Sequence, residues 1–112
     1  MIYFTGPNSI LPCCETATIN DVVEYCKTQT VLGVDTETEG LDFTCKKMIM
    51  FQIGTEEHQY IIDTRHISIE PLRGILEDAN IIKIFHNAKF DYKFIKKWSD
   101  ITCEGIYDTF LA

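Results

Sequence analysis

The sequence lacks any hydrophobic run long enough to cross a bilayer, and its N-terminus lacks the basic start and apolar stretch of a signal peptide. Internal repeats, low-complexity segments and Cys-x-x-Cys motifs are absent too. The five cysteines are an odd number, so a disulfide framework is not expected. Adjacent Cys13 and Cys14 have no spaced partner pair for a soft metal, and Cys26 falls on an apolar helix stripe. These absences predict a cytoplasmic protein without a membrane partner.

Basic charge is also scarce. The chain has 17 acidic and 10 basic residues and a net charge of −7. Nonspecific binding to nucleic acid depends on Lys and Arg side chains that contact phosphates, so a general nucleic-acid coat protein is not expected. Metal ions can nevertheless supply positive charge to phosphates. Five basic residues gather in one stretch, where they form either a solvated face or phosphate contacts: Lys83, Lys89, Lys93, Lys96 and Lys97.

The 112 residues, 46% hydrophobic and 24% charged, fit a single globular domain spanning 1–112. Apolar runs predict strands at 2–5, 31–34, 48–53, 59–63, 81–85 and 101–106, with a hairpin turn at 54–57. Helical spacing predicts one helix after an N-cap at Thr18, one with Pro71 in its first turn and Ala79 facing inward, and one over 88–98. This order predicts an α/β fold, with a mixed sheet of three antiparallel strands followed by parallel strands and helices on both faces. The apolar end at 110–112 predicts a fold truncated at its C-terminus.

Two carboxylates follow the apolar run Val31–Val34. Because side chains alternate along a strand, Leu32 and Val34 take one face and Asp35 and Glu37 share the other. Acids at the exit of a strand often simply accompany the chain into water. Two acids this close at a buried strand nevertheless repel each other and favour a nearby cation. Oxygen ligands suit Mg²⁺ or Mn²⁺, so the pair is a candidate metal site.

A second group of polar residues follows the strand at 81–85. Asn87 is a candidate N-cap for the next helix. Asp91 precedes Phe94, Ile95 and Trp98 by three, four and seven residues, which places it on the core-facing stripe. The positive end of the helix dipole alone explains an acid there. The alternative is that Asp91 joins the first two acids as a third metal ligand. His86 either orients a phosphate or makes an ordinary hydrogen bond at the strand end.

These two motifs resemble those of the DEDD superfamily of 3′–5′ exonucleases, and most closely the proofreading exonuclease domain of family A DNA polymerases. The first motif of that family, Asp-x-Glu, is matched by Asp35 and Glu37, and the extended form Asp-Thr-Glu-Thr-Glu-Gly-Leu-Asp runs to Asp42. The second motif is matched by Asn87, Phe90 and Asp91. The pair Asp108–Thr109 is similar to the Asp-Thr that opens the next helix in the polymerase group.

The resemblance implies a ribonuclease-H-like fold and hydrolysis of terminal phosphodiesters with two Mg²⁺ or Mn²⁺ ions. The implied substrate is a single-stranded DNA 3′ end, with RNA not excluded, and the implied product is a nucleoside monophosphate. The implied catalytic residues and metal ligands are Asp35, Glu37 and Asp91. The implied substrate contacts are Thr36, Thr38, Leu41, Asn87 and Phe90.

The sequence departs from the family at its third motif. Tyr-x-x-x-Asp or His-x-x-x-Asp is absent after Asp108, which we expect to cap the next helix. We therefore expect an incomplete exonuclease domain, feebly active alone, from the N-terminal part of a DNA polymerase or nuclease. A C-terminal segment, a polymerase domain or a partner chain would complete it. The alternative is a catalytically inactive module that binds nucleic acid or protein.

Overall fold

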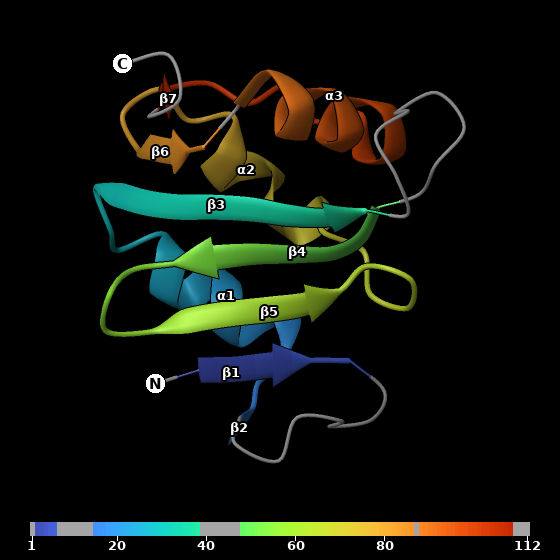
Figure 1. Ribbon diagram of the computed structural model, residues 1–112. Coiled ribbons are helices and arrows are strands. Elements are labelled where there is room, and N and C mark those ends of the chain that lie inside the picture. The colour runs from blue at the N-terminus through green and yellow to red at the C-terminus, as the bar shows by residue number, and fades with distance from the viewer. Residues whose placement is uncertain (1, 7–14, 39–47, 87, 109–112) are drawn as a thin grey trace.

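A seven-stranded sheet forms the centre of the molecule, with strands in the order β2-β1-β5-β4-β3-β6-β7 (Figure 1). The computed structural model describes residues 2–6, 15–38, 48–86 and 88–108. The strands are β1 (Ile2–Thr5), β2 (Glu15–Thr16), β3 (Val31–Thr38), β4 (Met48–Gly54), β5 (Gln59–Asp63), β6 (Ile82–Phe85) and β7 (Ile106–Asp108). The helices are α1 (Ile19–Cys26), a 3₁₀ turn η1 (Glu70–Leu72), α2 (Arg73–Leu76) and α3 (Ala88–Ser99).

The pairing of the strands confirms the predicted ribonuclease-H-like mixed sheet. Strands β3, β4 and β5 form an antiparallel meander, and β6 and β7 continue the sheet in parallel beside β3. Strand β1 pairs in parallel with both β5 and β2, and β2 was not predicted. The last strand lies at 106–108 rather than at 101–106. Glu104 N–H donates to the Leu76 carbonyl at the end of α2, at 2.9 Å, and only from Gly105 onward does the backbone bond to β6, where Lys83 N–H donates to the Gly105 carbonyl at 2.8 Å.

The helices pack on one face of the sheet, which we call the inner face. The connections through α1, α2 and α3 each join parallel strands and advance in the same direction across the sheet. Because such crossovers are almost always right-handed, they bring their helices to the same side. In Figure 1, α1 and α2 lie behind the sheet. The sequence predicts helices on both faces. The helices within the described ranges all lie on the inner face, so they do not test the prediction for the opposite, outer face. None of these helices is long and apolar enough to span a bilayer.

Alternation along β3 follows the sequence prediction. Leu32, Val34 and Thr36 are buried on the inner face, and Asp35 and Glu37 are exposed on the outer face. The inner-face side chains join those of the helices in one hydrophobic core. The predicted cap of α1 is confirmed as a capping box, in which Thr18 and Asp21 exchange backbone–side-chain hydrogen bonds.

Two residues predicted to face the core are exposed. Helix α2 ends at Leu76, so Ala79 is not helical and does not lie on the buried face of that helix. Trp98 is 41% exposed in the last turn of α3, whereas Ile101, two residues beyond the end of that helix, is fully buried in the core. The remaining predicted contacts of these helices, including Phe94 and Ile95, are buried as expected.

The predicted hairpin turn between β4 and β5 requires a glycine at its start. Thr55 N–H donates to the His58 carbonyl at 2.8 Å, which closes the turn. A Cβ atom on Gly54 would lie 2.2 Å from that same carbonyl oxygen, so no other residue fits without moving the backbone.

The two described cysteines behave as small core residues. Burial raises the pKa of Cys26 to about 12 and that of Cys103 to about 11, so neither forms a thiolate ligand near neutral pH. This confirms the core role predicted for Cys26. The Cys13–Cys14 pair and Cys45 lie outside the described residues.

Lys83 is fully buried beneath the β6–β7 edge, although the sequence groups it with possible phosphate contacts. Its Nζ donates to the backbone carbonyls of Asp78 and Glu104, the latter at 2.9 Å. Burial lowers its pKa, because the charged form loses hydration. Lys83 therefore ties the turn after α2 to the segment before β7 and is not available to a phosphate.

Replacing Lys83 with methionine is expected to lower the free energy of unfolding by roughly 2 kcal/mol, because the Glu104 carbonyl loses a charged donor within the protein. Urea denaturation followed by circular dichroism measures the change. The matched variant Lys97→Met alters an exposed lysine in α3 and should leave the transition midpoint almost unchanged. Equal effects of the two substitutions would show that Lys83 does not hold these segments together.

Candidate active site

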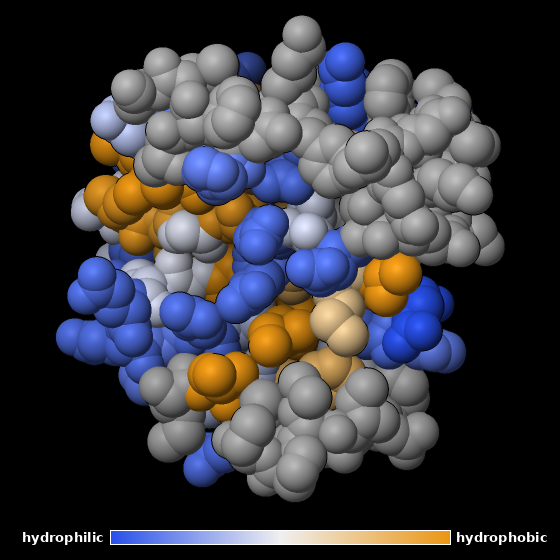
Figure 2. Space-filling model, in the orientation of Figure 1, coloured by the Kyte–Doolittle hydropathy of each residue, from blue (hydrophilic) through white to orange (hydrophobic). Residues whose placement is uncertain are grey.

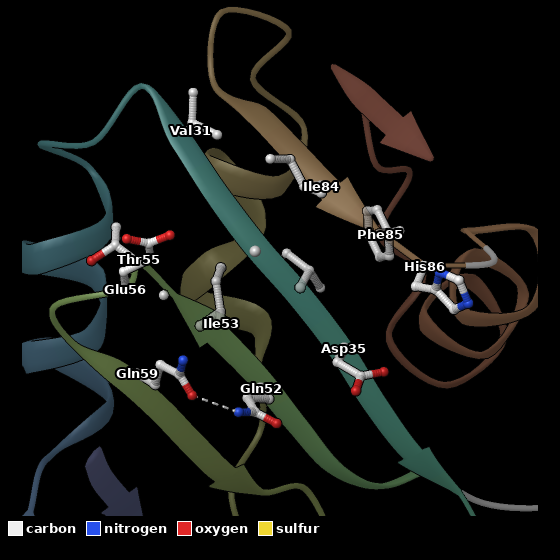
Figure 3. A pocket seen from close by; sticks show the side chains of 13 residues that line it. Val31, Asp35, Gln52, Ile53, Thr55, Glu56, Gln59, Ile84, Phe85 and His86 are labelled. Carbon is white, nitrogen blue, oxygen red and sulfur yellow. Dashed lines mark hydrogen bonds between the residues drawn. The ribbon is translucent and has the colours of Figure 1, made fainter. Parts of the chain in front are cut away.

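Asp35 and Glu37 lie side by side on the outer face of β3. The strand continues to Thr38, so the two acids stand within it rather than at its exit. Strands β4 and β6 flank β3, and Asp35 pairs directly with Gln52 of β4. Both carboxylates are exposed, and Figure 3 shows the Asp35 side chain projecting from the sheet. The central strand therefore presents two acids, two residues apart, on the outer face.

Asp91 lies in the first turn of α3, directly after the strand next to β3. Its side chain is 3% exposed and accepts a hydrogen bond of 2.6 Å from the hydroxyl of Thr36. Thr36 stands between Asp35 and Glu37 and points to the inner face. The hydroxyl thus joins the strand of the first motif to the helix of the second. Thr36 was predicted as a substrate contact, but the structure places its buried side chain against Asp91 instead.

The carboxyl group of Asp91 is held in an unfavourable environment for a negative charge. Its pKa is raised from 3.8 to about 6, chiefly by burial, although the hydrogen bond from Thr36 acts in the opposite direction. The charges of Asp35, Asp108 and Glu37 raise it further. None of the ion pairs formed between described residues involves Asp91, Asp35 or Glu37. The acids of both motifs are therefore close enough to repel one another, and no ion pair between residues that the structure describes neutralises them.

The three carboxylates gather without converging on a single point. Within the described residues, no three His, Cys, Asp or Glu side chains are close enough together to hold a metal ion. Asp35 and Glu37 project from the outer face, whereas Asp91 turns toward Thr36 on the inner side. Their chemistry nevertheless fits a hard divalent cation, because all the donors are carboxylate oxygens and a nearby cation stabilises the charge of a buried carboxylate.

Asp108 is a further acid near this site that the sequence reasoning did not assign to it. It ends β7, paired with Phe85 at the end of β6. The helix that it was predicted to cap lies outside the described residues. Asp108 ranks after Asp35 and before Glu37 among the charges that raise the pKa of Asp91. The ends of parallel strands share one edge of a sheet, so a strand prediction that ran to 108 would have found it.

The other predicted contacts are only partly described. Leu41 and Asn87 lie outside the described residues, as do the side chains of Thr38 and Phe90. Among the lysines, Lys96 bonds to Asp100 and Thr102 at the C-terminal end of α3. Asp91 lies in the first turn of the same helix, at its opposite end.

A cavity of about 580 Å³ opens on the outer face beside Asp35 (Figure 3). It runs along β3 to Val31 and is bordered by Ile84 and His86 from β6 and its end. Across the cavity, Gln52 Nε2 donates to Gln59 Oε1 at 3.0 Å. Sequence reasoning missed both glutamines, because their partnership depends on the register of β4 and β5.

Most of the chain matches a known family and a curated relative. A family model described as 3′–5′ exonuclease matches residues 13–112. DNA polymerase I of Aquifex aeolicus is 38% identical over 82 residues, which are 72% of this chain and 13% of that protein. The chain thus spans about an eighth of the length of this curated relative.

Solved structures share the fold at lower identity. The catalytic core of RRP6 from Trypanosoma brucei has a TM-score of 0.76 and 21% identity, over 97% of this chain and 29% of that one. NrnC of Brucella melitensis, in a structure with bound Mg²⁺, has a TM-score of 0.69 and 20% identity, over 96% of this chain and 48% of that one. Given the family match across nearly all of its length, the chain belongs to the 3′–5′ exonuclease family.

Proposed function

We propose that this chain forms the part of a metal-dependent 3′–5′ exonuclease domain that carries Asp35, Glu37 and Asp91. The observation that carries this proposal is the buried carboxyl of Asp91, which Thr36 connects to the strand of the first two acids. A fold that needed only stability would place an apolar residue at this position. An acid retained there, repelled by its neighbours, is consistent with a site that binds a cation.

Two Mg²⁺ or Mn²⁺ ions would be held by the three carboxylates. Bound there, such ions stabilise the attacking and the leaving oxygen of a phosphodiester. Asp35 and Glu37 would bind on the outer face, where substrate has access. Asp91 would serve the second ion, with Thr36 fixing its orientation. Asp108 adds negative charge to the same edge of the sheet.

The proposed substrate is the single-stranded 3′ end of DNA, in a proofreading reaction that releases nucleoside monophosphates. The 38% identity to a DNA polymerase I supports DNA over RNA. Thr38, Leu41, Asn87 and Phe90 stay predicted substrate contacts, and a polymerase domain stays the predicted neighbour. The cytoplasm is the proposed site of action.

The direction in which the DNA is shortened and the dependence of this reaction on metal together test the proposed function. The protein is incubated in molar excess with a 5′-labelled single-stranded DNA and Mn²⁺, and the products are resolved by length. We expect a ladder shortened one nucleotide at a time from the 3′ end, with release of nucleoside 5′-monophosphate. Removal of the metal with EDTA should abolish the ladder, because the three carboxylates then have no cation to stabilise the transition-state charge.

A DNA carrying a 3′-terminal phosphate block, or the variant Glu24→Gln on the exposed side of α1, serves as the control. The blocked end should resist shortening, and the variant should act like the parent. A protein that binds the DNA but never shortens it, even at high Mn²⁺, would favour the inactive binding module instead.

A further inference from the structure

An exposed arginine follows the end of β5. Arg65 lies two residues beyond that strand, and its side chain is 50% exposed. We propose that Arg65 binds a phosphate of the single-stranded DNA on the 5′ side of the scissile phosphate, with Asp63 as the residue that orients it; this inference rests on the proposed function. The planar fork of N–H donors on an arginine matches the oxygens of a phosphate group.

A buried carboxylate holds the guanidinium of Arg65 from one side. Asp63 is the last residue of β5, and its side chain is only 6% exposed. Arg65 Nε donates to Asp63 Oδ1 at 3.1 Å, and Arg65 Nη2 donates to Asp63 Oδ2 at 3.4 Å. Burial acts to raise the pKa of Asp63, but the hydrogen bonds and charge of Arg65 outweigh it and hold that pKa below its ordinary value. Asp63 therefore stays charged near neutral pH and fixes the direction of the fork.

The bonds to Asp63 use only part of the fork. A guanidinium has five N–H donors, and two of them go to this carboxylate. Between the residues that the structure describes, no hydrogen bond occupies the donors on Nη1 of Arg65. In Figure 2, strongly hydrophilic atoms reach the surface at the right-hand edge, at the height of the end of β5 in Figure 1. Arg65 thus combines a fixed direction with donors that a phosphate can use.

The turn after β5 does not need this guanidinium. The backbone N–H groups of His66 and Ile67 donate to the Asp63 carbonyl at 3.1 and 2.9 Å. The backbone N–H of Arg65 donates to Asp63 Oδ1 at 3.1 Å. Other residue types at position 65 would make the same backbone bonds, and an ion pair whose arginine is half exposed contributes little to stability. A ligand therefore explains the fixed fork better than the fold does.

The register of the sheet places Arg65 near the chemistry. Strands β3 and β5 are both antiparallel to β4, so they run the same way and end at the same edge in Figure 1. Glu37 pairs with Met50, and Met50 pairs with Asp63, so these residues form one row across the sheet. Two strand spacings of about 4.8 Å set Glu37 and Asp63 roughly 10 Å apart. A DNA strand that rises about 3.4 Å or more per nucleotide covers this distance within about three nucleotides.

A pair of matched variants separates a phosphate contact from the general effect of charge. Arg65→Gln removes the proposed contact. Lys27→Gln is the control, because Lys27 is also a half-exposed cation in an ion pair, 54% exposed and 2.8 Å from Glu24. Lys27 caps the end of α1, before β3 begins, so it lies at the opposite end of that strand from Glu37. Both variants remove one positive charge and one exposed ion pair.

Binding of 5′-fluorescein-labelled hexathymidylate is followed by fluorescence anisotropy in Mn²⁺ at several salt concentrations, over times short relative to hydrolysis. We expect Arg65→Gln to weaken binding about tenfold, as the loss of one charged hydrogen-bond donor would. The slope of log affinity against log salt should become shallower by about 0.7, the value for one phosphate contact on a single strand. Lys27→Gln should keep the parental slope and an affinity within about twofold of the parent.

Asp63→Asn gives a sharper comparison. It removes a negative charge from an acidic chain, so general electrostatics alone would strengthen DNA binding. The proposal predicts the opposite, a weakening of about threefold to tenfold, because Arg65 loses the charged partner that orients it. Arg65→Lys should keep the parental slope and lose about threefold in affinity, because lysine has no fork. Unlabelled dithymidine monophosphate, whose single phosphate occupies the scissile position, should compete equally well in the parent and in Arg65→Gln.

Each outcome decides the proposal. Parental affinity and slope in Arg65→Gln, tighter binding by Asp63→Asn, or no binding by the parent would overturn the phosphate contact. If thermal unfolding shows that Asp63→Asn does not fold, Arg65→Lys and Arg65→Gln supply the comparison. Calorimetric titration with Mn²⁺ alone should show parental affinity in Arg65→Gln. A parent that binds hexathymidylate through Arg65 but binds no Mn²⁺ would support the contact while refuting the proposed metal-dependent function, so the two failures are distinguishable.

Discussion

Replacing Asp91 with asparagine is expected to raise the free energy of unfolding of the chelated protein by roughly 3 kcal/mol at pH 8, the equivalent of a pKa raised from 3.8 to about 6. A carboxyl whose pKa is higher in the folded protein binds its proton more tightly there. The stability that this proton contributes is present below about pH 4 and is lost as pH rises toward 6. Asparagine carries no charge, and its carbonyl oxygen can still accept the hydrogen bond from Thr36. The same variant should lose metal affinity.

Urea denaturation in EDTA from pH 4 to pH 8 measures this effect. The difference between Asp91→Asn and the parent should grow across that range and level off above about pH 6. Asp100→Asn is the matched control, since that side chain is 84% exposed and pairs with Lys96. It should change stability by less than about 0.5 kcal/mol. An Asp91→Asn protein that is less stable than the parent at pH 8 would show that the carboxylate is not strained in the fold.

Replacing Asp35 with asparagine is expected to reduce the rate of DNA shortening by at least about a thousandfold, as removal of essential catalytic groups does. The physical reason is the loss of a negative oxygen ligand from a site whose cations stabilise the charge of the transition state. Because Asp35 is exposed on the outer face, the fold does not depend on it. The thermal unfolding midpoint should therefore stay close to that of the parent.

Single-turnover assays on 5′-labelled DNA measure this loss, with Asp100→Asn again as the control that retains the parental rate. Excess Mn²⁺ should not restore the activity of Asp35→Asn. Retention of more than about a tenth of the parental rate by this variant would remove Asp35 from the catalytic machinery.

The sheet and the first acidic pair were predictable, because both follow from local periodicity. Alternation in β3 set the faces of Leu32 and Asp35, and turn residues marked the hairpin after Gly54. The side on which helices pack was not predictable in this way. It depends on the order of all strands in the sheet, which fixes the direction of each crossover.

Contacts between side chains and groups far apart in the sequence were the least predictable features. The bond between Thr36 and Asp91 joins residues 55 positions apart, and periodicity alone gives no signal for it. Lys83 looked like a surface lysine, because its carbonyl partners come from two irregular segments. The hydrogen bond between Gln52 and Gln59 depends on the register of β4 and β5. Such contacts arise from tertiary packing, which local propensity does not encode.

Calorimetric titration with Mn²⁺ is the most direct measurement of the central idea, that acids from β3 and α3 bind cations together. The parent should bind Mn²⁺, and Asp35→Asn and Asp91→Asn should each bind it at least about tenfold more weakly, since each loses a charged ligand. Asp100→Asn should match the parent. Equal Mn²⁺ affinity in the parent and in both site variants would contradict a shared metal site.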